Sequence, residues 1–201
     1  MGKGCTISLI VGGVIVFALF LFGMFLIGTY NSMVTFNEDA TAGWAQVENQ
    51  YQRRFDLIPN LVSTVKGYAK HESETFILVT EARSKVGQIN IKASDLNDPA
   101  KLKQFQSAQD GLSGALSKLM VVIEKYPDLK ANKNFLALQS QLEGTENRIA
   151  VERRRFNESV KVYNKKIKQF PANMMANMFG FSERPYFEGE EGTNKAPKVE
   201  F

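Results

Sequence analysis

Three charged residues occupy positions that the pattern of this sequence otherwise gives to apolar side chains. Glu72 and Arg83 interrupt an apolar stripe that recurs every seven residues, and Glu152 interrupts a second stripe. An ionised group that faces a core needs a partner. One interpretation is a set of buried ion pairs that fix helix register, with Glu72 against an arginine of a helix expected over about residues 135–170. In this interpretation Arg83 pairs with Glu146 or Glu152. The other interpretation is acid–base catalysis by a pair of carboxylates.

The remaining sequence lacks the residue sets that familiar enzymes use. It has no nucleophile with its base, no Glu-x-x-His and no glycine loop of the kind that holds phosphate. One histidine, His71, and one cysteine, Cys5, are too few for a zinc site, which needs about three or four N or S ligands. We therefore expect no catalytic residue, no metal and no cofactor, and we favour ion pairs that fix register.

Size and charge narrow the range of partners. The 201 residues suffice for one domain and a short extra segment. The formal net charge of +4 is only mildly basic. Basic residues gather between Arg148 and Lys168, but glutamates stand among them, as expected on the solvated face of a helix. We therefore expect no nucleic-acid partner.

A long uncharged run near the N-terminus predicts a membrane anchor. It extends from Ile7 to Gly28, about 22 residues, which is enough to cross a hydrocarbon layer of ~30 Å. The alternative is a signal peptide, but its apolar core is typically about 7–15 residues and ends in an A-x-A-like site, whereas this run ends in GTYNSM. Gly4, Ser8 and Gly12 form a spacing that permits close approach of two helices. We expect an uncleaved single span.

The charges around this run predict its direction. Lys3 is the only basic residue before it, and none follows until Arg53, whereas three acidic residues do. The positive-inside rule then places the short N-terminus in the cytoplasm and the domain outside it.

Beyond the anchor, apolar side chains recur every seven residues from Trp44 onward, a spacing typical of helices that pack side by side as in a coiled coil. Prolines, glycines and polar turns divide this pattern into helices over about residues 36–88, 99–126 and 135–170. Short turns between them predict an all-α fold, an up-down-up bundle of three long antiparallel helices. The expected division is 1–29 for the anchor, 30–171 for the bundle and 172–201 for an irregular tail.

Pro59 lies inside the most strongly patterned segment, QRRFDLIPNLV. It cannot donate a hydrogen bond to the carbonyl of Phe55. The first helix is therefore either continuous and kinked, or it restarts with Asp56 as its N-cap. Both outcomes favour a structural bend over a ligand site.

The predicted helices differ in length, which leaves part of the first without cover. The first is about 67 Å long and the second about 42 Å, so the lowest ~25 Å of the first would lack a partner within the chain. An exposed aromatic row usually marks an interface, and tethering favours self-association there. The alternatives are a bend at Pro59 or cover by the tail. The row consists of Trp44, Val47, Tyr51 and Phe55.

The region after the third helix is rich in methionine and phenylalanine. Met174, Met175, Met178, Phe179 and Phe181 follow the stop at a proline. We expect these flexible apolar side chains to cap the end of the bundle or to meet a partner.

Many stretches of the chain resemble the LemA family. They are YN at Tyr30, WAQVENQYQRRFDLIPNLVSTVKGYAKHE from Trp44, EARSKV, EKYPDLKANKNF, LQSQLEGTENRIAVERRRFN, VYN, FP, FGF, YFE and APKVEF. The likeness covers about residues 30–201. It implies a bacterial, membrane-anchored, largely α-helical protein with no established catalytic activity, usually drawn with its short N-terminus outside. Family members often lie genetically near membrane proteases and other envelope proteins, which implies a scaffold or adaptor role.

We therefore expect a non-enzymatic, single-pass protein of the bacterial inner membrane whose bundle self-associates and acts as a scaffold at the cell envelope. Its partners would be the lipid bilayer, further copies of the chain and envelope proteins such as a membrane protease. One alternative is a regulatory adaptor for such a protease. The other is a tethered enzyme that uses Glu72 and Glu152.

Overall fold

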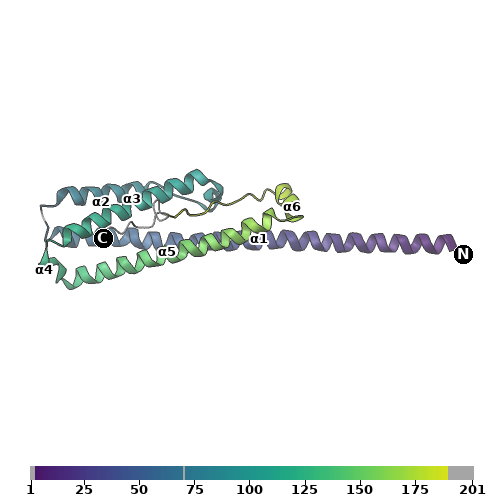
Figure 1. The fold of residues 1–201 in the computed structure, drawn as a ribbon, viewed down its shortest axis with the longest axis horizontal. Coiled ribbons are helices and arrows are strands. Elements are labelled where there is room, and N and C mark those ends of the chain that lie inside the picture. Colours follow the sequence, from purple (N-terminus) through teal and green to yellow (C-terminus); the bar gives the residue numbers. More distant parts are fainter. Residues whose placement is uncertain (1–2, 70, 190–201) are drawn as a thin grey trace, which may run out of the picture.

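The computed structural model describes residues 3–69 and 71–189, and every regular element within these ranges is a helix. The predicted all-α bundle behind a long apolar N-terminal helix is confirmed (Figure 1). The elements are α1 Lys3–Lys66, α2 Ser73–Gly87, the 3₁₀ helix η1 Ala93–Asn97, α3 Pro99–Ile123, α4 Pro127–Lys130, α5 Lys133–Lys168 and α6 Ala172–Phe179.

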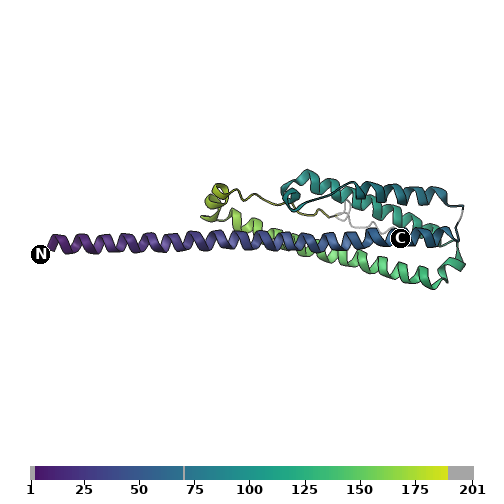
Figure 2. The same cartoon turned by 180° about the vertical axis from the view of Figure 1, so that it is seen from behind.

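The four long helices lie side by side, and the chain reverses direction between each one and the next. α1 packs mainly on α5, and α2 packs mainly on α3. Figures 1 and 2 show α1 continuing far beyond the bundle toward the N-terminus, while α6 lies beside it at that end of the bundle. The segment that follows α6 then runs back along the bundle.

The single helix predicted over residues 36–88 is wrong, because the chain divides it into α1 and α2. Glycine is the poorest helix former after proline, and α1 ends just before Gly67. The chain then turns back, so that Phe76 and Val79 pack in the same core as Val62 and Val65. A seven-residue pattern that continues through the turn is thus satisfied by two antiparallel helices, and the bundle has four long helices instead of three.

The other helix boundaries follow the capping signals of the sequence. Asp98 caps α3 by accepting hydrogen bonds from Ala100 N and Lys101 N at 2.9 and 3.3 Å, with Pro99 in the first turn. Asn132 caps α5 in the same way. The helices predicted over 99–126 and 135–170 therefore lie within three residues of α3 and α5 at each end.

α1 is one unbroken helix of 64 residues that passes through Pro59. Its first part is long and apolar enough to cross a membrane, and the most hydrophobic part of this stretch is not buried by the rest of the chain. No turn or loop separates this stretch from the bundle, so α1 runs straight across the expected boundary at residues 29–30. The direction of the apolar stretch therefore determines the direction of the bundle.

The core forms three successive layers along the bundle. The layer furthest from the N-terminus lies among α1, α2, α3 and α5, and contains Val65 and Leu119. The middle layer is aromatic and contains Trp44 and Phe156. The third layer, nearest the apolar stretch, joins Met33 of α1 to α5 and α6.

Candidate functional site

The aromatic row of α1 is buried, so the prediction that it forms an exposed interaction surface is wrong. Trp44 is 3% exposed, Val47 0% and Tyr51 5%, and Phe55 is half-buried. The comparison of helix lengths considered only the second helix, and the alternative of cover by the tail is the one that the structure partly adopts. The cover actually comes from α5, which is about 54 Å long and antiparallel to α1, and from the segment that follows α6.

Aromatic rings from three parts of the chain enclose Trp44. Phe105 of α3 and Phe156 of α5 approach it edge-on, with ring centroids 5.4 and 5.9 Å away. Phe187, from the segment after α6, stacks on it at 5.8 Å with an interplanar angle of 14°. Such geometries are the favourable ones for aromatic pairs. The row is therefore part of a core that holds α3, α5 and the segment after α6 against α1.

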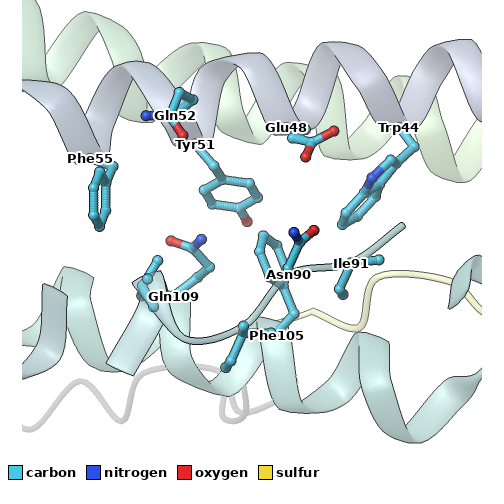
Figure 3. A pocket seen from close by; sticks show the side chains of 12 residues that line it. Trp44, Glu48, Tyr51, Gln52, Phe55, Asn90, Ile91, Phe105 and Gln109 are labelled. Carbon is cyan, nitrogen blue, oxygen red and sulfur yellow. The ribbon is translucent and has the colours of Figure 1, made fainter. Parts of the chain in front are cut away.

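Beside this core, α1 and the chain between α2 and α3 border an open groove of about 290 Å³. Figure 3 shows Tyr51 and Phe55 pointing from α1 toward Phe105 and Gln109 of α3, with Asn90 between them. Burial raises the pKa of Tyr51, although the cationic Arg153 and Arg54 oppose this shift. The hydroxyl is therefore protonated at neutral pH, so Tyr51 offers the groove a hydrogen bond and an aromatic contact rather than a phenolate base.

The charge that is truly buried in the middle of the bundle is Arg54, which is 1% exposed. Its guanidinium donates to Glu146 Oε1 on α5 and to Ser113 Oγ on α3, both at 2.7 Å. It also donates to the side chain and the main-chain oxygen of Gln109. One arginine thus joins three helices, which is the role that was predicted for Glu72, Arg83 and Glu152.

A signal for Arg54 was present in the sequence. It stands seven residues after Val47 and seven before Leu61, which are 0% and 1% exposed. All three share one heptad column. The predicted stripe was the column that begins at Trp44, so the column of Arg54 was not predicted to be buried.

The three charges predicted to be buried lie at the edge of the core instead, each half-buried. Glu72 accepts a hydrogen bond from Tyr126 Oη at 3.2 Å, not from an arginine of α5. Glu152 pairs with Arg155 at 2.8 Å on its own helix. The expected pairing of Arg83 with Glu146 or Glu152 is also wrong, since Glu146 binds Arg54.

The structure does not bring the proposed carboxylate pair together. Glu72 lies in the turn after α1, beside the N-terminal end of α5, where Asn132 Nδ2 donates to Tyr68 Oη at 2.8 Å. Glu152 is 20 residues further along α5 than Asn132, a distance of about 30 Å. The geometric basis for acid–base catalysis by these two residues is therefore lost.

Arg83 instead compensates for Pro59. Its Nε donates to the main-chain oxygen of Phe55 at 3.3 Å, and its guanidinium lies 3.8 Å above the Phe55 ring. Asp56, considered as an N-cap, accepts from Gln52 Nε2 at 2.8 Å within an unbroken helix. The continuous alternative for α1 is the one that the structure adopts.

The irregular tail predicted over 172–201 begins with the helix α6, so the prediction is wrong for residues 172–179. The described residues after α6 are irregular, and three side-chain amides hold them in place. Asn164 of α5 donates to Arg184 O at 2.8 Å and accepts from Arg184 N at 3.0 Å. Asn157, two turns earlier, makes the same pair of bonds with Phe187, at 3.0 and 2.9 Å. These amides replace the partners that a neighbouring strand would supply.

A third amide, that of Gln106 on α3, repeats the pattern with Glu188 at 2.9 and 3.2 Å. Arg153 Nη2 also donates to Glu188 O at 2.9 Å. We call residues 182–188 the strap. The strap could not be predicted from the sequence, because the residues of α3 and α5 that contact it are polar and no apolar period marks them. Residues 190–201 of the predicted tail lie outside the described residues.

The arrangement defines a class of protein: a helical bundle closed by its own C-terminal strap and continuous with one helix that could span a membrane. A family model described as the LemA family matches residues 43–201. The chain belongs to that family, as its resemblance predicted.

Curated relatives cover most of the chain. Magnetosome protein MamQ of Magnetospirillum gryphiswaldense is 30% identical over 93% of this chain and 74% of its own length. Magnetosome protein MamQ 2 of Paramagnetospirillum magneticum is 29% identical over 94% of this chain and 74% of its own. Protein LemA of Metamycoplasma hominis is 27% identical over 88% and 78%. None of these names denotes an enzyme.

Proposed function

We propose that this protein is a non-enzymatic scaffold, anchored by one span in the inner membrane of a bacterial cell envelope, that associates with copies of itself and presents its bundle to other envelope proteins. The observation that carries the proposal is the continuity of α1 from the apolar stretch to Lys66. A flexible tether would let the bundle tumble. An unbroken helix instead keeps each face of the bundle at one height and one orientation above the bilayer.

Contacts near the base of α1 strengthen this coupling. Met33 is 0% exposed and packs in one layer with Tyr163 and Ile167 of α5 and with Met175 of α6. The bundle therefore packs against α1 within a few residues of the apolar stretch. A partner bound to the bundle would be held at a fixed distance from the membrane surface.

Self-association no longer has support from the aromatic row, and we place it in the span. Confinement to a membrane raises the effective concentration of copies. Gly12 continues the spacing of Gly4 and Ser8, and a Cβ at Gly12 would meet no atom of the chain within 4 Å. Two helices can approach closely along such a line of small residues.

The test compares two glycine substitutions in the full chain. Counting copies by single-molecule photobleaching in lipid vesicles should show a loss of oligomers for Gly12→Leu. Gly13→Leu is the matched control, since its Cβ also meets open space but points about 100° away around the helix. Monomeric wild-type protein, or equal loss in both variants, would contradict association through the line of small residues.

The positive-inside rule supports a bundle outside the cytoplasm. A single cysteine at exposed Lys161, in a C5S background, should react with a membrane-impermeant maleimide in intact cells. Labelling only after the cells are opened would place the bundle in the cytoplasm and change which partners it can meet.

A further inference from the structure

We propose that α6 is a second membrane contact, which lies in the lipid headgroup layer and inserts one apolar face into the bilayer beside the span. This inference concerns how the bundle sits on the membrane and does not depend on self-association. Four side chains form the α6 apolar face: Phe170, Met174, Met178 and Phe179.

The two faces of α6 have opposite surroundings. Ala172, Met175 and Ala176 are 2–6% exposed and pack in the layer that contains Met33. The members of the α6 apolar face are 81%, 65%, 70% and 51% exposed, in chain order. Exposed apolar residues are ordinary when scattered, but four on one eight-residue helix and its preceding turn form a patch that calls for an occupant.

The height of α6 along α1 identifies that occupant. The ring centroid of Phe179 lies 4.9 Å from that of Tyr30, and Phe181 lies 5.8 Å from the same ring. Leu26, inside the apolar stretch, packs against the same layer as α6. Figures 1 and 2 show α6 at the end of the bundle nearest the N-terminal part of α1.

These contacts place α6 within the headgroup layer. If the hydrocarbon region ends near Gly28, Tyr30 is about 3 Å beyond it and Met33 about 7.5 Å, at 1.5 Å per residue. The headgroup layer is roughly 5–8 Å deep on each side of a bilayer. An amphipathic helix at this depth presents its apolar face to the acyl boundary, and tyrosine is enriched at the same level.

The charges around α6 favour an anionic surface. No Asp, Glu, Lys or Arg occurs from residue 169 to 182 or from residue 4 to 37. The last turn of α5 carries Lys165, Lys166 and Lys168, directly before α6. Glu183 forms an exposed ion pair with Lys168 at 2.6 Å. Among the described residues, no ion pair includes Lys165 or Lys166. Lysines near a membrane surface attract anionic headgroups.

Depth-dependent fluorescence quenching tests the contact in the full-length protein. Single cysteines replace Met178 or, as control, Val121 of α3, in a C5S background, and each carries a bimane label. Val121 is 69% exposed, close to the 70% of Met178, but it belongs to the far end of the bundle. The proteins are reconstituted into vesicles that contain phosphatidylglycerol.

The label at M178C should be quenched by spin-labelled lipid and protected from iodide, and the label at V121C should show the reverse. Equal iodide quenching at both sites would overturn the proposal. Protection at M178C from both quenchers would also overturn it, because the face would then be covered by protein, such as α6 of a second copy.

The lysines are tested with the same probe. K165Q/K166Q should make the label at M178C measurably shallower in phosphatidylglycerol vesicles, whereas K125Q/K133Q, which removes two exposed lysines at the far end of the bundle, should not. In vesicles of zwitterionic lipid alone, the difference between the two double variants should disappear. An unchanged depth in K165Q/K166Q would remove the electrostatic part of the proposal.

Discussion

Arg83 Nε donates to the main-chain oxygen of Phe55 over 3.3 Å, and the Arg83 guanidinium covers the Phe55 ring at 3.8 Å. Phe55 is four residues before Pro59, so its carbonyl is the one that the proline leaves without a helical donor. α2 therefore supplies the hydrogen bond that α1 lacks. The proline does not break α1, and it creates an acceptor at which the neighbouring helix is held.

This relationship predicts a coupling between the two helices that a mutant cycle can measure. Replacing Arg83 by alanine should cost about 1–2 kcal/mol in the free energy of unfolding, from one hydrogen bond and one cation–π contact. In a Pro59→Ala background, residue 59 regains its N–H and can satisfy the Phe55 carbonyl. The cost of R83A should then fall measurably in urea unfolding. An equal cost in both backgrounds would show that Arg83 acts only through its stacking on the ring.

Replacing Arg54 should lower the free energy of unfolding far more than replacing its neighbour Arg53. R54A leaves the buried acceptors of Gln109 without their donor and opens a cavity, which we expect to cost about 2–4 kcal/mol. R53A removes an exposed side chain and should change the free energy of unfolding by less than about 0.5 kcal/mol. E146Q keeps an acceptor and should fall between them. Similar losses for R53A and R54A would contradict the role of Arg54 as the centre of the bundle.

The strap should open when the side-chain amides of α3 and α5 that bind it are removed. N157A removes two hydrogen bonds to Phe187, each worth about 1 kcal/mol, so amide exchange at residues 182–188 should accelerate more than about fivefold. N147A, an exposed asparagine of the same helix, is the matched control. Hydrogen exchange with mass spectrometry separates the two outcomes. Unchanged exchange in N157A/N164A would mean that the Phe187 ring alone holds the strap.

The heptad pattern predicted the apolar core positions of α1 and α2, such as Val65 and Phe76, because burial depends on which side of a helix a residue occupies. It failed for the charged positions, since Glu72 and Arg83 lie at the edge of the core. It did not locate the reversal at Gly67, since Val65, Ala69, Phe76 and Val79 face the same core whether the helix continues or folds back. That ambiguity is physical: two antiparallel helices and one long helix can bury the same column of side chains.

The same limitation explains the error at Trp44. Its column was correctly identified as apolar, but its cover comes from Phe187, which is distant in sequence and belongs to a segment with no period of its own. The contacts of polar residues were even harder to predict from the sequence. Gln106, Asn157 and Asn164 resemble ordinary solvated positions on helices, and only the fold shows that each one binds the main chain of the strap.

Alkaline conditions should weaken the middle layer of the core through Tyr51. Burial raises the pKa of Tyr51 in the folded protein. The folded state therefore keeps the proton at a pH where the unfolded chain, with a tyrosine pKa of about 10, has released it. The resulting stabilisation is complete below pH ~10 and is lost as the pH rises through the folded pKa. We expect Y51F to lose less stability than wild type between neutral pH and pH ~11, as measured by urea unfolding at each pH. A decline equal to that of wild type would mean that other groups account for the alkaline sensitivity, and absorbance titration of the phenolate provides the direct check.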